Sequence, residues 1–357
     1  MAPIPHLESP LTPADLNERL AQFPRMGLAH LPTPLEPLPR LSQHLGGPSL
    51  WIKRDDATGL AFGGNKARQL EFRLGRAVAQ GADCVVAGAA VQSNFCRQIA
   101  AACAKLGLEA FLVLRRTQGQ PPDPPQGNFL LDLLLGAHVE FVEGTEEAHR
   151  AHILALAEDL RAQARHPYVT GWTDVAFGAL GYVAAALELW EECQRLGLEP
   201  TALVTSSGGA TQAGLLVGVR ALGWSLPIWS VYHGGHSPDA RPRVAQIAQE
   251  AAQLLRLPFR FAAQDVLAFN QYFAPGYPTP SEAGWEALRL MAHTEGIVLD
   301  PVYTAKALAG LVDQVRQGRW GKGDTVLFLH TGGTPVLFAY AGEIPSRMTR
   351  MGQTTRR

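Results

Sequence analysis

Short apolar segments alternate with helical segments along most of the chain, and this alternation constrains the fold more than any other feature. Residues 84–88 (CVVAG) and 201–205 (TALVT) are apolar on both faces of a strand, and helical segments follow them. Strands that are buried on both faces belong to parallel sheets whose connections are covering helices. The sequence therefore predicts an α/β protein with parallel sheets and contains no internal repeat that would favour a repeat architecture.

Composition and charge narrow the functional classes. The 357 residues suffice for two domains or one large α/β unit. The formal net charge of −1 provides no excess of basic groups for nucleic acid or an anionic membrane. No apolar run approaches the ~18 residues of a membrane span, and residues 1–30 lack the apolar core of a signal peptide. We expect a cytoplasmic protein with neither a nucleic-acid nor a membrane partner.

The cysteines Cys84, Cys96, Cys103 and Cys193 have neither a CxxC arrangement nor the spacing of metal ligands. They fit reduced thiols better than a disulfide framework, and we expect no metal site. Residues 347–357 hold four arginines in a short stretch that we expect to form a loose tail.

A glycine-rich turn at residues 61–68 (AFGGNKAR) is the first candidate for chemistry. Its two glycines let the backbone bend sharply, and a helical segment follows, so Lys66 lies where the turn meets a helix. A lysine that is partly desolvated there would have a lowered pKa and act as a nucleophilic amine. A solvated surface lysine is the alternative, and the turn taken alone favours that alternative.

A second candidate is the segment 206–211 (SSGGAT), which follows an apolar strand and opens a helix. Backbone N–H groups at such a helix start, together with the helix dipole, bind phosphate. The segment has no Walker lysine and does not match GxGxxG, which favours a lone phosphomonoester over a nucleotide. A tight strand–helix connection with incidental serines is the alternative. The candidate ligands are Ser206, Ser207, Gly208, Gly209, Ala210 and Thr211.

A reactive amine and one phosphate cradle are the minimum equipment for pyridoxal 5′-phosphate, whose aldehyde needs an amine and whose phosphate needs an anion site. The chain resembles the pyridoxal-phosphate enzymes of the tryptophan-synthase-β fold (fold type II). Within them it is similar to the family of D-cysteine desulfhydrases, 1-aminocyclopropane-1-carboxylate (ACC) deaminases and L-cysteate sulfo-lyases. The resemblance extends over roughly residues 22–340. It rests on residues 31–36 (LPTPLE), 51–56 (WIKRDD), 63–66 (GGNK), 91–94 (VQSN), 300–304 (DPVYT) and 330–333 (HTGG).

The resemblance implies a set of contacts to the cofactor. Lys66 would bind it covalently and would carry protons once substrate releases the amine. Asn94 would donate a hydrogen bond to its 3′-oxygen, and the segment 206–211 would hold its phosphate. Thr304 would face the pyridine nitrogen, where ACC deaminases carry a glutamate that keeps the nitrogen protonated. A hydroxyl there favours a neutral ring, which suits β-elimination.

The resemblance also implies contacts to the substrate. Ser93 would lie near its carboxylate or Cα, while Tyr277 and Tyr303 would bind it or transfer protons. From their residue types alone, Ser93 and Asn94 could instead be the cap of the helix that follows, a role compatible with ligand binding. The two tyrosines could likewise be packing residues.

We therefore predict a lyase that eliminates the β-substituent of a small amino acid. D-cysteine is the first substrate, with pyruvate, ammonia and hydrogen sulfide as products. L-cysteate sulfo-lyase and ACC deaminase are the alternatives, and a non-catalytic metabolite-binding homologue is the hypothesis from another class. Phe95 stands where the family has histidine or glutamine, so a polar contact is lost and the substrate and its stereochemistry stay open.

The resemblance also implies two α/β domains with the cofactor in the cleft between them. Residues 1–68 and 182–357 would form the large cofactor-binding domain, and residues 69–181 a small inserted domain. A homodimer is expected from the family.

Overall fold

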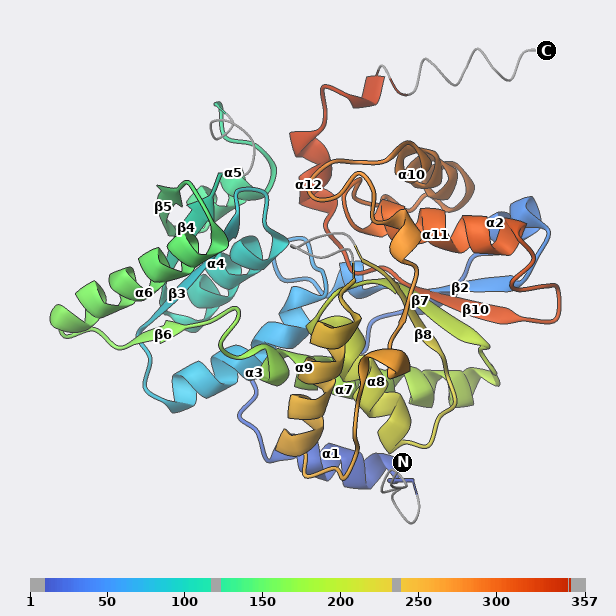
Figure 1. Ribbon diagram of the computed structural model, residues 1–357, viewed down its shortest axis with the longest axis horizontal. Helices are drawn as coiled ribbons and strands as arrows, with labels where there is room; N and C mark the ends of the chain where they lie inside the picture. Colours follow the sequence, from blue (N-terminus) through green and yellow to red (C-terminus); the bar gives the residue numbers. More distant parts are fainter. Residues whose placement is uncertain (1–9, 117–122, 233–238, 346, 348–357) are drawn as a thin grey trace.

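Two sheets flanked by helices make up the protein (Figure 1). The computed structural model describes residues 10–116, 123–232, 239–345 and 347. The predicted loose tail, residues 347–357, lies almost entirely outside these ranges.

The elements have the following bounds. The strands are β1 (Leu35–Pro37), β2 (Ser49–Lys53), β3 (Cys84–Ala90), β4 (Glu109–Arg115), β5 (His138–Val142), β6 (Pro167–Val169), β7 (Ala202–Ser206), β8 (Ile228–Val231), β9 (Leu267–Ala268) and β10 (Thr325–Leu329). The helices are α1 (Pro13–Ala21), α2 (Pro39–Leu45), α3 (Lys66–Ala79), α4 (Asn94–Leu106), α5 (Gly127–Leu134), α6 (Glu146–Ala162), α7 (Val175–Leu196), α8 (Ala210–Ala221), α9 (Arg241–Leu254), α10 (Glu282–Glu295), α11 (Thr304–Arg316) and α12 (Thr334–Ala339).

Both sheets are built mainly from parallel strands. The larger has six strands in the order β1-β2-β10-β7-β8-β9, and the smaller has four in the order β5-β4-β3-β6. Among these neighbouring pairs, only β1 and β2 are antiparallel. The predicted α/β class with parallel sheets is confirmed.

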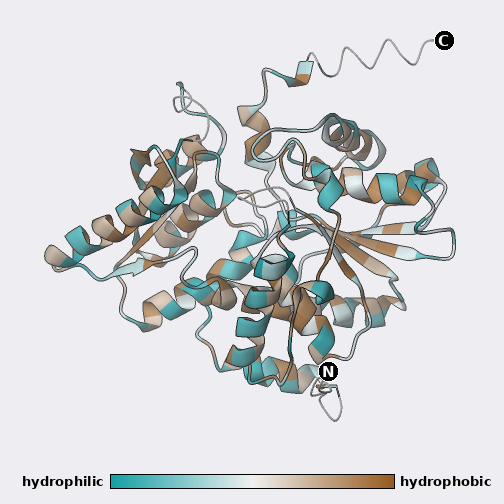
Figure 2. Ribbon diagram, in the orientation of Figure 1, coloured by the Kyte–Doolittle hydropathy of each residue, from teal (hydrophilic) through white to brown (hydrophobic). Residues whose placement is uncertain are grey.

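Apolar strands form the interior, as their sequences predict. Every side chain of β7 is buried, and the first four residues of β3 are buried as well. Figure 2 shows helices with both hydrophobic and hydrophilic residues around these strands, as expected for helices that bury one face. The central strands therefore hold their carboxyl ends in fixed positions.

Two short elements have little local signal in the sequence. β1 forms because Leu35–Pro37 pairs at a sheet edge, where a proline without an N–H group is tolerated. α12 follows the motif at residues 330–333. It is 6 residues long, which is too short for helical periodicity to reveal it.

The smaller sheet comes from one internal stretch of chain, between Cys84 and Val169, and the larger sheet takes its strands from the two flanking stretches. Helices α3 and α7 pack against each other where the chain passes between the sheets. The division into residues 1–68 with 182–357 and residues 69–181 stays a prediction, and its second boundary falls inside α7.

Within the described ranges, no helix is both long enough and apolar enough to cross a membrane. All four cysteines are free and buried, and Cys96 packs in the core of the smaller sheet.

Candidate active site

A cavity of about 430 Å³ lies at the carboxyl ends of strands from both sheets. Ala90 ends β3, Arg115 ends β4, Ser206 ends β7 and Thr331 follows β10, and all four line this cavity. Open parallel sheets bind ligands at this edge, and pockets of this volume accept small molecules. The predicted site residues that line it are Lys66, Ser93, Asn94, Tyr277, Tyr303, Ser206, Ser207, Gly208, Gly209, Ala210 and Thr211.

The turn before Lys66 has a backbone shape that requires glycine. Gly63 and Gly64 have φ angles of 65° and 120°, and a Cβ on Gly63 would lie 1.9 Å from the carbonyl oxygen of Asp56. The N–H of Gly64 donates to the Asp55 carbonyl oxygen over 2.9 Å. The chain is thus fixed immediately before α3 begins at Lys66.

The side chain of Lys66 lines the cavity and is only half-buried, because the exposed part of the side chain borders the cavity. Burial lowers the pKa of Lys66 to about 8, and the positive charges of Arg73 and Arg243 lower it further. A larger fraction of this amine is neutral near physiological pH than for an ordinary lysine. This is the condition for nucleophilic attack on an aldehyde.

The segment 206–211 leads from the end of β7 into the start of α8. The Ser207 hydroxyl oxygen accepts from the N–H groups of Gly209 and Gln212, both over 3.2 Å. In the described part of the chain, the N–H groups of Gly208, Ala210 and Thr211 have no hydrogen-bond acceptor. Such donors at the positive end of a helix dipole suit a phosphate.

Gly208 lets this helix start come close to the neighbouring strand. A Cβ at Gly208 would lie 2.1 Å from ring atoms of Tyr232, which also lines the cavity. The lysine turn and the helix start are also joined directly. The side-chain amides of Asn65 and Gln69 donate to the Thr211 hydroxyl oxygen over 2.9 and 3.1 Å. The two predicted features are therefore neighbours in space.

Ser93 caps α4, and its hydroxyl oxygen accepts from the N–H groups of Phe95 and Cys96 over 3.1 and 3.2 Å. The capping interpretation is therefore correct, and Ser93 also lines the cavity together with Asn94. Phe95 lines the cavity too, with the guanidinium of Arg73 5.2 Å from its ring centre. Its ring shapes the pocket.

Tyr277 and Tyr303 form a pair on the cavity wall, with ring centres 5.9 Å apart. Burial raises the pKa of Tyr277, and a hydrogen bond from Tyr303 partly offsets this effect. Burial raises the pKa of Tyr303 well above its ordinary value, and Tyr277 adds to the rise. Both hydroxyls stay protonated at neutral pH and can donate protons.

Thr304 is fully buried and does not line the cavity. Its hydroxyl donates to the Asp300 carboxylate over 2.7 Å and accepts from the Asp300 N–H over 2.9 Å. The Asp300 carboxylate also accepts from the N–H groups of Val302, Tyr303 and Thr304. Asp300 and Thr304 thus hold the first turn of α11 and the backbone of Tyr303.

The sequence analysis missed several basic residues of the cavity. Arg73, Arg115, His149, Arg150 and Arg243 line it, alongside the acidic Glu146. They come from four elements that are far apart in the chain, α3, β4, α6 and α9, so no local signal could have brought them together. An excess of positive charge favours ligands that carry a phosphate and a carboxylate.

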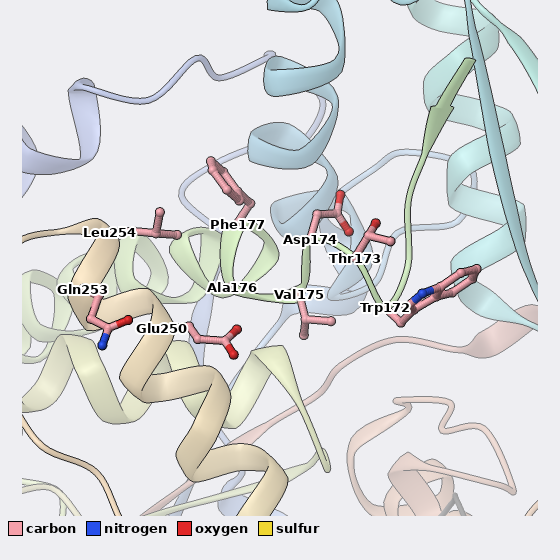
Figure 3. Close-up of a pocket in the computed structure, with 9 residues that line it drawn as sticks. All are labelled: Trp172, Thr173, Asp174, Val175, Ala176, Phe177, Glu250, Gln253 and Leu254. Atoms are coloured by element: carbon pink, nitrogen blue, oxygen red, sulfur yellow. The ribbon is translucent and has the colours of Figure 1, made fainter. Parts of the chain in front are cut away.

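A second hollow of about 400 Å³ lies between residues 172–177 and α9 (Figure 3). It shares Trp172 and Val175 with the larger cavity. Its Asp174 carboxylate already accepts from Arg73 and from the hydroxyls of Tyr168 and Thr170. We place the candidate active site in the larger cavity, where the reactive amine lies.

The cavity fits a cofactor with an aldehyde and a phosphate. The Lys66 amine has a lowered pKa, and N–H donors of the helix start are available on the wall next to it. Residues 27–332 match the family described as "Pyridoxal-phosphate dependent enzyme". The chain belongs to this family. As in the rest of the family, its cofactor is pyridoxal 5′-phosphate.

Relatives within the pyridoxal-phosphate-dependent enzymes cover nearly the whole chain. A D-cysteine desulfhydrase of Klebsiella pneumoniae is 42% identical over 327 residues, which span 90% of this chain and 98% of that protein. One of Salmonella typhi is 41% identical and spans 90% and 97% of the two chains.

Solved structures place the fold among the type II enzymes of the family. A crystal structure of an ACC deaminase homologue has a TM-score of 0.84 and 34% identity, and covers 93% of this chain and 99% of its own. Threonine deaminase isoform 2 from Solanum lycopersicum has a TM-score of 0.67 at 16% identity, covers 98% and 93%, and shares the fold. The predicted tryptophan-synthase-β-like fold is confirmed.

Proposed function

We propose that this enzyme is a D-cysteine desulfhydrase, which converts D-cysteine and water into pyruvate, ammonia and hydrogen sulfide. The observation that carries the proposal is the meeting of Lys66, the start of α8 and the Tyr277–Tyr303 pair in one cavity. Identity of 42% to a D-cysteine desulfhydrase over 98% of its length supports the substrate.

The cofactor, when bound, supplies an electron sink for the charge that remains on Cα after its proton leaves. Lys66 would hold the cofactor covalently, and its amine, when free, would be the base for the Cα proton. A pKa of about 8 suits this task, since such an amine accepts a proton and also releases it near neutral pH. Segment 206–211 holds the phosphate, and Asn94 binds the 3′-oxygen.

The other cavity residues bind the substrate and the leaving group. Ser93 contacts the substrate carboxylate, and the excess of arginine side chains on the cavity wall supports binding of that anion. Tyr277 and Tyr303 remain protonated at neutral pH, so either hydroxyl can give a proton to the departing sulfur. Hydrolysis of the released three-carbon enamine then gives pyruvate and ammonia.

ACC deamination is the second candidate, because an ACC deaminase homologue shares the fold at 34% identity. We favour β-elimination because position 304 holds a threonine hydroxyl, which does not protonate a pyridine nitrogen. The Thr304 side chain lies off the cavity surface, so its contact with that nitrogen stays a prediction. L-cysteate elimination is a further alternative, which the basic cavity wall would accommodate.

The first experiment records the visible spectrum of purified protein with added cofactor, before and after borohydride. We expect a visible band that borohydride abolishes in wild type and that Lys66→Ala lacks. Pyruvate release is then measured with D-cysteine, L-cysteine, L-cysteate, D-serine and ACC, and D-cysteine should react fastest. A colourless protein, or a reducible band in Lys66→Ala, would contradict the role of Lys66. A normal band with no turnover of any substrate would favour the non-catalytic binding protein.

We also propose a cytoplasmic homodimer whose partners are small amino acids rather than nucleic acid or membranes. The net charge of −1 supports the part of this proposal that excludes nucleic acid and membranes as partners. Light scattering of the purified protein would test the dimer, and fractionation of the source cells would test the location. The two-domain division is part of the same proposal, and the origin of the smaller sheet in one internal stretch supports it.

A further inference from the structure

The side-chain amide of Asn94 is held on its oxygen side by two donors. The Arg97 guanidinium donates to the Asn94 amide oxygen over 3.1 Å, and the Asn128 amide nitrogen donates to the same oxygen over 2.9 Å. A guanidinium carries donors and no acceptor, so the atom that faces it must be the amide oxygen. The Asn94 NH2 group therefore points away from Arg97.

The free side of this amide belongs to the cavity wall. Asn94 lines the cavity, and a Cβ built on Gly333 would lie 3.1 Å from the Asn94 amide nitrogen. Within the described part of the chain, no protein acceptor takes a hydrogen bond from that nitrogen. Its two N–H donors are thus available to a ligand.

Arg97 is itself fixed from several directions. It is fully buried, and its guanidinium also donates to the Gly63 carbonyl oxygen over 2.8 Å and to the Asn128 amide oxygen over 2.9 Å. The Asn128 amide nitrogen donates in turn to the Gln92 carbonyl oxygen over 3.0 Å. The guanidinium thus connects Asn94 to the turn that precedes Lys66.

Two acidic groups, Asp132 and Asp300, act on the positive charge of Arg97, and burial raises the pKa of both carboxyl groups. Asp132 is buried, and neither of its carboxyl oxygens has a hydrogen-bond partner among the described residues. Burial raises the pKa of Asp132 to about 8, so this group is mostly neutral at pH 7. Burial lowers the pKa of Arg97 to about 10, which still leaves the guanidinium charged.

We propose that Arg97, supported by Asn128, is a positioning residue that fixes the Asn94 amide with its NH2 group toward the 3′-oxygen of the bound cofactor. The inference rests on the role that the proposed function gives to Asn94. A donor held in one orientation favours the anionic form of that oxygen, and the buried charge behind the amide strengthens the donor. The cofactor spectrum therefore reports the orientation of Asn94.

The test compares the holoenzymes of wild type, Asn94→Ala, Arg97→Met and the double variant. The readouts are the pH titration of the visible band and the dissociation constant of pyridoxal phosphate. Loss of one hydrogen bond should weaken binding about tenfold. Arg97→Met should shift the titration in the same direction as Asn94→Ala. In the Asn94→Ala background, Arg97→Met should add no further shift.

Gln98→Met is the matched control. The Gln98 side-chain amide donates to the same Gly63 carbonyl oxygen as Arg97, but among the described residues the donors to the Asn94 amide oxygen are Arg97 and Asn128, so loss of the Gln98 amide should leave the titration unchanged. Asn128→Leu removes the second donor to Asn94 and takes the place of Arg97→Met if that variant does not fold.

The inference is overturned if Asn94→Ala leaves the titration unchanged, or if Arg97→Met (or Asn128→Leu in its place) leaves it unchanged. It is also overturned if the shifts of the two single variants add up in the double variant, or if Gln98→Met shifts the titration as much as Arg97→Met does. A wild type without a visible band would instead contradict the proposed function.

Discussion

At the scale of single residues, three groups have pKa values of about 8: the half-buried Lys66 and the buried Lys306 and Asp132. Burial is the largest cause in each case. It lowers the pKa of the two lysines and raises that of the carboxyl group, because a buried site disfavours whichever form is charged. The same physical effect thus prepares an amine for chemistry and keeps an acid neutral beside Arg97.

The pKa of Lys66 predicts how cofactor uptake depends on pH. The rate at which apoenzyme gains its visible band should rise as the pH approaches 8 and level off above it, because the amine is by then largely neutral. An unperturbed lysine would give a rise that continues toward pH 10.5. Stopped-flow absorbance measures the rate, with Lys66→Ala as the control that gains no covalent band. A rate still climbing steeply above about pH 9 would contradict the lowered pKa.

Asp132→Asn should change how stability depends on pH. The pKa of Asp132 is about 8 in the folded protein and lies above the ordinary 3.8. Between these two pH values the carboxyl group is therefore protonated in the folded protein and ionised in the unfolded chain. The stabilising effect of that proton is present at low pH and is lost as the pH rises toward 8. Asparagine does not titrate, so the variant does not lose this stability. Its free energy of unfolding should rise relative to that of wild type by roughly 1.4 kcal/mol per pH unit between about pH 5 and 8.

Urea denaturation of wild type and Asp132→Asn at the two pH values measures this difference. Glu158→Gln is the control, because it replaces a carboxyl group with an amide at an exposed position of α6. A stability difference between Asp132→Asn and wild type that is independent of pH would show that Asp132 titrates normally.

At the scale of elements, the loop before α10 carries Tyr277 without regular secondary structure at that residue. Buried Lys306 on α11 donates to the carbonyl oxygens of Gly276 and Phe273 over 3.0 and 3.5 Å. The Tyr340 hydroxyl donates to the Pro278 carbonyl oxygen over 2.7 Å. Backbone contacts from two helical regions therefore determine where the Tyr277 hydroxyl lies.

Lys306→Met should loosen this loop while leaving the cofactor bound. The variant loses both hydrogen bonds to the loop backbone, and a misplaced Tyr277 should lower kcat about tenfold or more. Hydrogen exchange of residues 270–280, followed by mass spectrometry, should be faster than in wild type. Lys322→Met, an exposed lysine, is the control. Unchanged exchange in Lys306→Met would show that Lys306 does not hold the loop.

At the scale of the whole molecule, a buried ionic network joins β2, α3 and α7. Arg68 on α3 bonds Asp55 over 2.9 Å and Glu188 over 2.8 Å, and Lys53 on β2 pairs with Glu188 and Glu192. Arg68 lies two residues after Lys66 on α3, about half a helical turn away. The network couples the reactive lysine to the larger sheet and to the helix that connects the two sheets.

Arg68→Met should destabilise the whole protein by about 3–5 kcal/mol, because the buried Asp55 carboxyl group would lose its bidentate partner. Arg161→Ala, which removes an exposed partner of Glu158, should cost no more than about 1 kcal/mol. Urea denaturation of both variants measures the contrast. Equal losses would mean that the Arg68 network is no more stabilising than a surface pair.

Much of the fold and part of the site follow from local sequence. Apolar strands predict parallel sheets because both faces need covering, and the segment 206–211 predicts an anion site because its pattern places N–H groups at a helix start. Thr304 shows what local sequence does not predict, namely which of two neighbouring side chains faces the cavity. It follows Tyr303 in sequence, but successive helical residues point about 100° apart, so Tyr303 faces the cavity and Thr304 faces Asp300.

The sequence by itself determined the α/β class, the two glycine-rich turns and, through its motifs, the family. Each of these depends on residues close together in the chain. Only the tertiary structure decided that Lys66 is desolvated, that Asn65 and Gln69 tie its turn to Thr211, and that distant arginines surround the cavity. The physical reason is that desolvation and electrostatic potential depend on every neighbour in space, and those neighbours are brought together by packing between the two sheets.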